Sequence, residues 1–385
     1  MIDIRFIYNI FRFSHFAVYV GLHILLMLGL FLEWLREQKA LKNAAGELPT
    51  VSVIIPVHNE SRRIEGLLRS LEVQDYPQAE FIFIDDRSLD GSAGKITAFI
   101  QRITGRYKAK IISLTENPGP NHKQYALARG IEASSAEFLL FTDADCEIPP
   151  YWIRGMIHRM SDTSVGVAIG PVLKRPGGKG FLNLYQCYEH GVRYVYLAGA
   201  AGLGMAGGGF GNNMILRRVC LDAVGGYEKV PPSPTEDAAL VSRIRSCSKY
   251  KIRAALGPDV HVITQGESTW KDLINQTLRW NNGGIFSPDP ATRFNYSFLM
   301  IIITLGVLGY LLLPFFPSIW PLPAGSVTVM VINTIANLSL FGVSLPKRNF
   351  CFGYALTLLF MPVYMALMTI MGYLGIKPRW KGERV

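Results

Sequence analysis

Long apolar stretches near both ends of the chain constrain its fold more than any other feature. Residues 13–35 are close to the ~20 apolar residues that a membrane-spanning helix needs, and no small-x-small cleavage site of a signal peptide follows them. Further apolar segments lie at 296–316, 326–345 and 350–376. Because the composition between residues 47 and 290 is globular, the sequence predicts a soluble domain between an N-terminal anchor and C-terminal membrane helices.

The domain boundaries and the orientation follow from these segments. If the globular domain is cytoplasmic, the chain returns to the cytoplasm at Lys347 and Arg348, in agreement with the positive-inside bias. A last segment that spanned would leave the basic tail outside, so we expect Pro362 to break it into a re-entrant hairpin. The expected location is the inner or plasma membrane of the cell, with the catalytic domain in the cytoplasm. The predicted domains are an anchor and linker at 1–46, a globular domain at 47–292, and membrane helices with a basic tail at 293–385.

Charge and cysteine content narrow the classes of partner. The formal net charge of +10 suits anionic lipid headgroups and anionic substrates. No motif that combines basic and aromatic residues supports binding to nucleic acid, so we expect none. The cysteines form neither a C-x-x-C pair nor a zinc-binding spacing, and they are interpreted as reduced thiols in a cytosolic setting.

The globular part alternates strands and helices. Buried strands are predicted at 51–56, 81–84, 110–114 and 138–142, and a loop and a helical pattern follow each of the first three. This spacing is typical of β-α-β units, so the fold class is α/β, with a parallel sheet and helices on both faces. Beyond residue 151 the pattern loosens, and it predicts strands at 165–171 and 212–216 and helices at 181–198, 217–224, 235–250 and from Ser268 onward.

Two carboxylates follow the fourth predicted strand. Asp143 and Asp145 stand one residue apart, directly after the apolar residues 138–141. In an open α/β sheet, ligands bind where strands end at their carboxyl edge. Carboxylate oxygens suit Mg²⁺ or Mn²⁺, which commonly complete their coordination with water and phosphate oxygens. The pattern therefore favours a metal-held diphosphate, although two Asp in a surface turn are the more common origin of D-x-D by itself.

Four further motifs accompany these carboxylates. They are S-V-I-I-P-V-H-N-E at 52–60, the Asp85-Asp86 turn, T-E-D at 235–237 and Q-x-x-R-W at 276–280. Taken together with D-x-D, they resemble the pattern of glycosyltransferase family 2 over residues 51–282. The resemblance implies the GT-A fold, in which a nucleotide-binding α/β domain is joined to an acceptor-binding half. It also implies inverting transfer of a sugar from a nucleotide sugar, with Mg²⁺ or Mn²⁺ held by the D-x-D motif.

The resemblance also assigns roles to individual residues. Asp237 matches the general base, Glu236 would orient it or the acceptor, and Asp145 would be the main metal ligand. Asp143 would hold the nucleotide sugar and share the metal, and Asp86 would contact uracil or ribose. The other implied positions are Pro56, His58, Glu60 and Lys123 in the nucleotide-sugar pocket, and Gly209, Asn212, Gln276, Arg279 and Trp280 on the side of the acceptor and diphosphate.

Physical chemistry supports these roles and supplies alternatives. Inverting transfer needs one base for the acceptor hydroxyl and no covalent intermediate. However, Glu236-Asp237 is also an ordinary acidic helix start. Gln276, Arg279 and Trp280 form one helical stripe, and such stripes usually pack. Arg87 departs from the family pattern, which often has Gly or Asn there, and it is either a phosphate contact or a solvated turn residue.

The predicted function is transfer from a UDP-sugar to a lipid or lipid-linked acceptor at the cytoplasmic membrane face. Q-x-x-R-W occurs in the cellulose, hyaluronan and poly-N-acetylglucosamine synthases and also in ceramide glucosyltransferase-like enzymes. A processive synthase acting on a glycan is therefore the alternative, but four apolar segments are few for a product channel. A non-catalytic nucleotide-binding membrane subunit is the alternative from another class. The sequence identifies neither the sugar nor any partner subunit.

Overall fold

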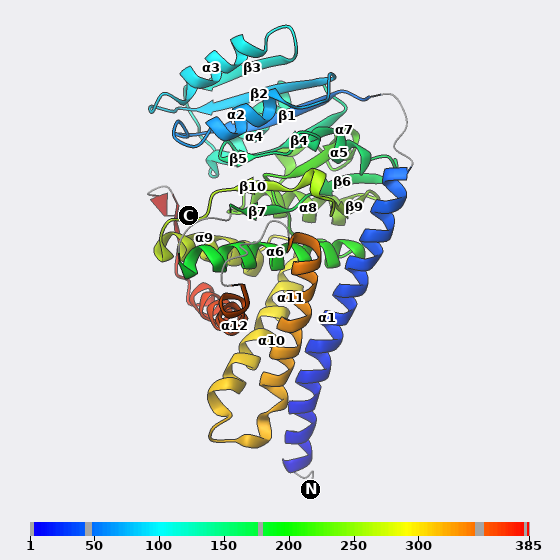
Figure 1. Ribbon diagram of the computed structural model, residues 1–385, viewed down its shortest axis with the longest axis vertical. Helices are drawn as coiled ribbons and strands as arrows, with labels where there is room; N and C mark the ends of the chain where they lie inside the picture. Colours follow the sequence, from blue (N-terminus) through cyan, green and yellow to red (C-terminus); the bar gives the residue numbers. More distant parts are fainter. Residues whose placement is uncertain (1–3, 43–47, 176–179, 343–349, 381–382, 385) are drawn as a thin grey trace. The chain divides into compact units, whose positions relative to one another are not determined.

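The computed structural model describes residues 4–42, 48–175, 180–342, 350–380 and 383–384 (Figure 1). The chain forms two compact units. The first, which we call the α/β unit, consists of Phe31–Lys174 and Ala200–Gln265. The second, the helical unit, consists of Met1–Leu30, Arg175–Gly199 and Gly266–Val385. The predicted domain boundaries stay a prediction.

A seven-stranded sheet organises the α/β unit, in the order β3-β2-β1-β4-β8-β6-β9. The parallel sheet predicted from the β-α-β spacing is confirmed for β1 to β4, and β8 runs antiparallel to both of its neighbours. The strands are β1 Val51–Val57, β2 Ala79–Asp86, β3 Lys108–Leu114, β4 Phe138–Phe141, β6 Val165–Ile169, β8 Met214–Arg217 and β9 Lys251–Ala254.

Short strands and helices complete this unit. A three-stranded sheet joins β5 Cys146–Glu147, β10 Val262–Thr264 and β7 Val172–Lys174. The helices are α2 Glu65–Glu72, α3 Ser92–Ile103, α4 His122–Glu132, α5 Trp152–His158, α7 Arg218–Ala223 and α8 Glu236–Cys247, with 3-10 turns η1 Tyr227–Lys229 and η2 Pro258–Val260.

Strands β1, β2 and β4 are buried along nearly their whole length because helices cover both faces of the sheet there, whereas the edge strand β3 has no fully buried residue. Val53 and Ile55 belong to one core cluster together with residues of α2 and α3. Ile54 points to the opposite face, where α4 packs. A Cβ atom on Gly130 of α4 would lie 2.6 Å from side-chain atoms of both Ile54 and Ile84, so glycine permits this close approach.

The order of the strands creates a topological switch point. The chain proceeds outward from β1 to β2 and β3, and then returns to add β4 on the other side of β1. Ligands of open α/β sheets bind outside the carboxyl ends of the strands at such a point. A functional site is therefore expected among the residues that follow β1, β2 and β4.

The helical unit contains α9 Trp270–Ile285, α10 Pro290–Leu312, η3 Pro317–Ile319, α11 Pro321–Phe341 and α12 Phe350–Tyr373. It also contains the strands β11 Arg379–Trp380 and β12 Glu383–Arg384, most of α6 Phe181–Gly202, and the first part of α1 Ile4–Lys42.

The expected break at Pro362 is wrong, because α12 continues through it as one helix. A proline removes one helical hydrogen bond, but packing can hold the helix on both sides of it. Met361, Tyr364 and Met365 are buried in the core of the helical unit and supply that packing.

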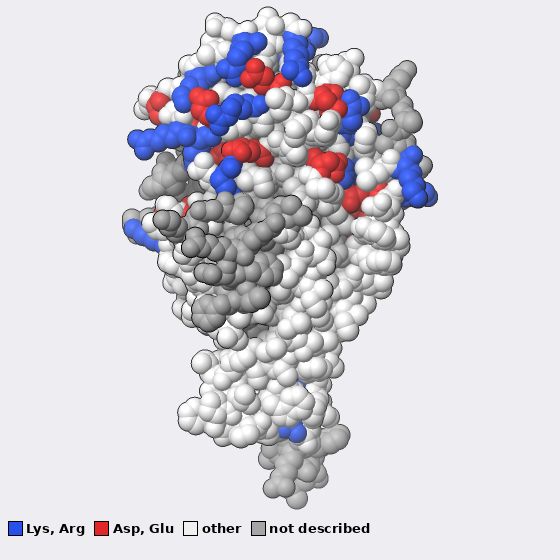
Figure 2. Space-filling model, in the orientation of Figure 1, with Lys and Arg blue, Asp and Glu red and all other residues white. Residues whose placement is uncertain are grey.

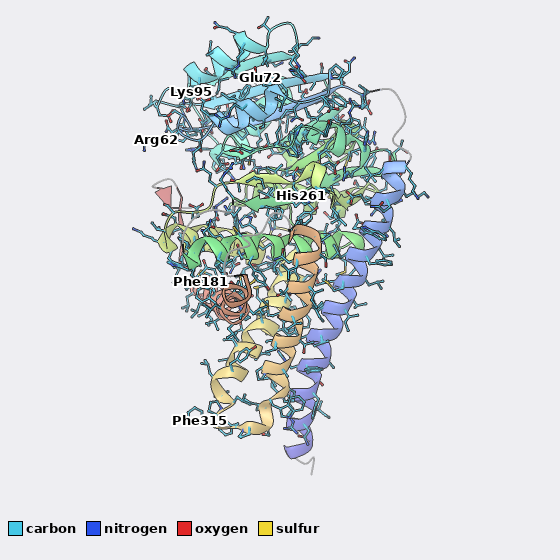
Figure 3. All side chains as sticks on the ribbon, viewed as in Figure 1. Arg62, Glu72, Lys95, Phe181, His261 and Phe315 are labelled. Atoms are coloured by element: carbon cyan, nitrogen blue, oxygen red, sulfur yellow. The ribbon has the colours of Figure 1, made fainter. Side chains whose placement is uncertain are left out.

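Four described helices are long and apolar enough to cross a membrane. The sequence predicted four apolar segments, but it expected the last of them to be a re-entrant hairpin. Their outward faces carry exposed large apolar side chains, such as Leu25 of α1, Leu311 of α10 and Leu359 of α12. Phe315, labelled in Figure 3, is 76% exposed between α10 and α11. Figure 2 shows coloured charged residues on the surface of the α/β unit and an almost uncharged surface over these helices. Apolar surface of this extent is typical of contact with lipid.

The last turns of α1 are fixed to the α/β unit by buried charges. One carboxylate oxygen of Glu37 accepts hydrogen bonds from Arg159 Nε at 2.7 Å and from the backbone N–H of Leu256 at 2.9 Å. Glu33 accepts one from the backbone N–H of Ala254 at 3.0 Å. Arg159 also pairs with Asp259 through Nη2 and Oδ1 at 2.9 Å. Because Glu33, Glu37 and Arg159 are buried, losing any one of them would leave a buried charge without its partner, so the last turns of α1 are an integral part of this unit.

Candidate functional site

Three of the four parallel strands deliver polar residues to the switch point. His58 and Glu60 follow β1, Asp86 ends β2, and Asp143 follows β4. The sequence placed these residues at strand ends, and the structure agrees. Two side chains from other parts of the chain, Lys123 and Asp237, join them.

Lys123 gathers carboxylates that are far apart in the sequence. Its Nζ lies 2.8 Å from Oδ1 of Asp143 and 3.2 Å from Oε1 of Glu236. Asp237, the next residue of α8, is near enough for its negative charge to contribute to the raised pKa of Lys123. We call Lys123, Asp143, Glu236 and Asp237 the Lys123 cluster. It brings the predicted D-x-D and T-E-D motifs into one place.

Local structure of α4 places Lys123 in this position. The Asn121 side chain caps the helix by accepting a hydrogen bond from the backbone N–H of Gln124 at 3.1 Å. Burial would lower the pKa of Lys123, but Asp143 and Glu236 raise it, and the net result is a pKa above its usual value. Lys123 therefore stays charged. In the structure it bridges two carboxylates, and its predicted place in the nucleotide pocket stays a prediction.

Asp237 is held by backbone groups. Its Oδ2 accepts a hydrogen bond from the N–H of Gly211 at 2.8 Å, and its Oδ1 accepts one from the N–H of Ala238 at 2.8 Å. Burial and the neighbouring Glu236 raise the pKa of Asp237 to about 6, while Lys123 and these two hydrogen bonds oppose the rise. A carboxylate with such a pKa can both hold and release a proton near neutral pH.

Gly211 is required for this contact. A Cβ atom at position 211 would lie 2.9 Å from Cβ of Asp237, which is closer than real Cβ contacts. The glycine-rich run therefore contributes one specific close approach. A small pocket opens beside it, lined by Leu127, Phe141, Gly211, Met214, Tyr227, Glu236, Asp237 and Leu240.

Asp145, the second carboxylate of D-x-D, has a different partner. Arg63 Nη1 lies 3.4 Å from its Oδ2, and Nη2 of the same guanidinium lies 2.7 Å from Oε2 of Glu60. The sequence motifs pointed to Glu60 and Asp145 but gave no indication of Arg63. The Arg63–Asp145 pair joins residues 82 positions apart in the sequence, so no local sequence pattern predicts it.

Asp86 lies in a second group at the end of β2. It accepts a hydrogen bond from Arg87 Nε at 2.7 Å and another from Asn117 Nδ2 at 2.9 Å. His58 Nδ1 lies 2.5 Å from the backbone oxygen of Asp86. We call His58, Asp86, Arg87 and Asn117 the β2-end cluster. Arg87 was expected to contact phosphate or to be a solvated turn residue, and in the structure it pairs with Asp86.

The donor set suits a hard divalent cation. Asp143 and Asp145 are 29% and 22% exposed, so both present oxygens to the surface of the site. Within the described ranges, no group of three or more His, Cys, Asp or Glu side chains could hold a metal. Mg²⁺ and Mn²⁺ sites with one or two carboxylates and substrate phosphates need no such group. Cys146 is no competing ligand, because burial, Asp145 and Asp143 raise the pKa of its thiol.

The remaining assigned residues of the α/β unit line the same region. Pro56 is partly exposed near the end of β1. Gly209 lies near Asp237, with a built Cβ 3.7 Å from that of the aspartate. Asn212 Nδ2 is 3.5 Å from Cys146 Sγ, next to Asp145.

The Q-x-x-R-W residues lie on α9, in the helical unit. Gln276 Nε2 donates to Glu267 Oε1 at 2.6 Å. The guanidinium of Arg193 stacks over the Trp280 ring, 4.9 Å from its centroid, and His190 contacts the ring edge-on at 5.5 Å. The packing expected of a helical stripe is thus present for Trp280. The roles of Gln276, Arg279 and Trp280 toward diphosphate and acceptor stay predictions.

Comparison with known proteins now identifies the class of enzyme. The sequence profile described as Glycosyl transferase family 21 matches residues 16–385. The chain belongs to this family. It is therefore a glycosyltransferase, as its motifs predicted, although the resemblance seen in the sequence was to family 2. The likeness of its motifs to the polymer synthases stays a prediction.

Relatives of this glycosyltransferase include enzymes named for lipid products. A beta-monoglucosyldiacylglycerol synthase of Trichormus variabilis is 24% identical over 318 residues, which are 77% of this chain and 66% of that protein. A probable glycosyltransferase of Bacillus subtilis, YdaM, is 26% identical over 277 residues, which are 68% of this chain and 62% of that protein. The chain thus spans just under two thirds of the length of these relatives.

A solved structure agrees with the fold. The mannosyltransferase PcManGT of Pyrobaculum calidifontis, in complex with GDP-Man and Mn²⁺, has a TM-score of 0.55 and 17% identity, covering 93% of this chain and 100% of that one. At this identity the likeness shows the fold alone. This glycosyltransferase has the GT-A-like fold that the sequence predicted, a mixed α/β sheet flanked by helices, with apolar helices that could span a membrane.

Proposed function

We propose that this glycosyltransferase moves a sugar from a UDP-sugar onto a hydroxyl group of a lipid or lipid-linked acceptor at the cytoplasmic membrane face, with inversion at the anomeric carbon. The observation that carries the proposal is the Lys123 cluster, in which Asp143 and Glu236 flank one ammonium group at the switch point and Asp237 follows in sequence. The raised pKa of Asp237 suits a general base.

The lipid acceptor rests on two further observations. Relatives are named for synthesis of a glucosyldiacylglycerol. Four helices within the described residues are long and apolar enough to cross a membrane, and they would keep the enzyme where lipid acceptors lie. A processive synthase needs a path for its polymer, for which four helices are few.

In the proposed reaction, the acceptor oxygen attacks the anomeric carbon while its proton passes to the carboxylate of Asp237. The bond from that carbon to the diphosphate breaks, and UDP leaves with the electron pair. The backbone N–H groups of Gly211 and Ala238 donate hydrogen bonds to the carboxyl group of Asp237. They hold this group in place both before and after it takes the proton from the acceptor. Lys123 pairs with both Asp143 and Glu236 and so offsets their negative charge. No covalent sugar–enzyme bond is needed.

Asp143 and Asp145 would hold Mg²⁺ or Mn²⁺ together with the diphosphate. When bound, such an ion neutralises negative charge on the departing phosphate oxygens. Arg63 lies beside Asp145 and Glu60, so a second positive charge is available at this edge of the site.

The decisive experiment uses the full chain in lipid vesicles that contain diacylglycerol or ceramide. Each of UDP-glucose, UDP-galactose and UDP-N-acetylglucosamine is added, UDP release is followed, and the product mass is measured. We expect one sugar on one lipid from one preferred donor. A ladder of oligomers would instead support the processive alternative, and UDP binding without any transfer would support a non-catalytic subunit.

A further inference from the structure

Arg87 has a backbone conformation that residues other than glycine rarely adopt. Its φ is +56°, in the left-handed region. Among the described residues only one other non-glycine residue, Asn59, has a positive φ, and it lies in the neighbouring loop after β1. Such conformations persist where the surrounding structure enforces them, and they cluster at functional sites.

The two loops hold each other in this conformation. The backbone N–H of Leu89 donates to Asn59 Oδ1 at 2.9 Å, and the N–H of Asn59 donates to Ser88 Oγ at 3.0 Å. The turn therefore directs the Arg87 side chain back onto Asp86, where Nε reaches Oδ1 at 2.7 Å. A turn built only to connect β2 with α3 has no need of an arginine in a strained position.

Asp86 and Arg87 differ in their exposure. The Asp86 side chain is 7% exposed, and Asn117 Nδ2 also donates to it at 2.9 Å. The Arg87 side chain is 36% exposed and extends toward His122, with Nη2 3.5 Å from the ring nitrogen. The result is a buried hydrogen-bond acceptor directly beside a partly exposed donor, fixed in one geometry by the two loops.

We propose that Arg87 acts together with Asp86 to select the nucleobase of the sugar donor, by reading a ring N–H that stands beside a carbonyl group. Uracil and guanine present that edge, whereas cytosine and adenine present a ring nitrogen acceptor beside an amino group. The carboxylate of Asp86 accepts from the ring N–H, and the guanidinium of Arg87 donates to the carbonyl oxygen. The resemblance implied a contact from Asp86, and the role of Arg87 is new. The inference depends on the proposed use of a nucleotide sugar.

Selectivity follows from both members of the pair. For cytosine or adenine, the carboxylate faces a ring nitrogen with no proton, and the guanidinium faces an amino group. An acceptor then faces an acceptor and a donor faces a donor, so neither hydrogen bond forms. The pair therefore disfavours cytosine and adenine as well as favouring uracil and guanine. A matched pair of contacts of this kind changes affinity by roughly 5-fold to 150-fold.

The test measures binding of UDP, GDP, CDP and ADP to the full chain by calorimetry, in the presence of Mg²⁺. The variants are Arg87→Met, Arg87→Gly and Arg87→Lys. We expect the wild type to bind UDP or GDP at least about 10-fold more tightly than CDP and ADP. Arg87→Met should weaken binding of the preferred nucleotide about 10-fold and bring the four affinities within a few-fold of each other, with Arg87→Lys intermediate because an ammonium lacks the planar fork.

Arg87→Gly separates recognition from folding. Glycine adopts a positive φ without strain, which offsets part of the stability lost with the Asp86 ion pair. This variant should therefore melt at a higher temperature than Arg87→Met and still lose base selectivity. The matched control is Arg62→Met, which removes an exposed arginine from the loop after β1 (Figure 3). It should change neither the melting temperature nor the order of the four nucleotide affinities.

Two results would overturn the inference, and they are distinguishable. If Arg87→Met and Arg87→Gly keep the wild-type order of the four nucleotides, Arg87 only neutralises Asp86, and the proposed transfer reaction stands. If the wild type binds none of the four, the nucleotide-sugar proposal fails and this inference fails with it.

Discussion

The β2-end cluster and the Lys123 cluster both hold carboxylates at the carboxyl edge of one sheet, yet their charges are balanced differently. In the β2-end cluster, Asp86 has its own arginine and an amide donor. In the Lys123 cluster, Asp143, Glu236 and Asp237 share one ammonium group. A balanced pair is suited to recognise a neutral ligand edge. A cluster with excess negative charge is suited to bind a cation and accept a proton.

The largest effect should come from removing divalent cations, because an ion held by Asp143 and Asp145 would neutralise charge on the departing diphosphate. We expect a chelator to reduce transfer by about 10⁴-fold, since a metal supplies several kcal/mol of charge stabilisation. Adding Mn²⁺ or Mg²⁺ in excess should restore the rate. The measurement is UDP release with lipid acceptor present. Full activity in the chelator would show that Asp143 and Asp145 work without a metal.

The Asp237→Asn change should remove the proposed base while leaving the β2-end cluster intact. We expect turnover to fall by about 10²- to 10⁴-fold, the usual contribution of a general base, with little change in UDP affinity. Steady-state kinetics measure the fall in turnover, and calorimetry measures the affinity for UDP. Asp222→Asn, an exposed aspartate on α7, is the matched control and should behave as the wild type. Full turnover by Asp237→Asn would remove Asp237 from the mechanism.

Lys123→Met tests whether the shared ammonium sets the protonation of Asp237. Because Lys123 lowers the pKa of Asp237 in the native protein, its loss should raise that pKa further. The base must be ionised, so wild-type kcat/KM should fall about 10-fold per pH unit below a pH of about 6. In Lys123→Met this acid limb should move to higher pH, together with a drop of roughly 10-fold in the plateau. An unmoved limb would mean that Lys123 has only a structural role.

The smallest effect is expected from Gly211→Ala. The added Cβ would lie 2.9 Å from Cβ of Asp237 and would displace that side chain or its hydrogen bond from the backbone. A loss of roughly 5-fold to 10-fold in kcat is expected, since small displacements of a base reduce its efficiency. Gly94→Ala is the control, because a Cβ there meets no atom within 4 Å. Equal rates for both variants would show that the Gly211 contact is dispensable.

The sequence predicted most of the elements in these two clusters but few of their contacts. Strands at 51–56, 81–84 and 138–142 appear as β1, β2 and β4, because apolar runs bounded by polar turns are a strong local signal. Short β5, β7 and β10 had no such signal, since strands of two or three residues show no period. The break expected at Pro362 failed because packing within the helical unit outweighs one missing hydrogen bond.

The candidate site shows the same limit. Asp143, Asp145, Glu236 and Asp237 were found from motifs, but the partners that set their charge were not. The sequence did not predict the pairing of Lys123 with Asp143, and it did not assign Arg63 at all. Both pairings join residues 20 or more positions apart. Only the strand order brings them together, and a single sequence does not reveal that order.

The buried pairs at the end of α1 have a practical consequence for anyone preparing a soluble form of this enzyme. Cutting the chain at the apparent linker near residue 47 would discard Glu33 and Glu37. Arg159 would then lose a buried carboxylate, and leaving a buried charge without its partner costs about 3–5 kcal/mol. A shortened protein that retains α1 from Phe31 onward would preserve these bonds, at the expense of a few exposed apolar residues that detergent can cover.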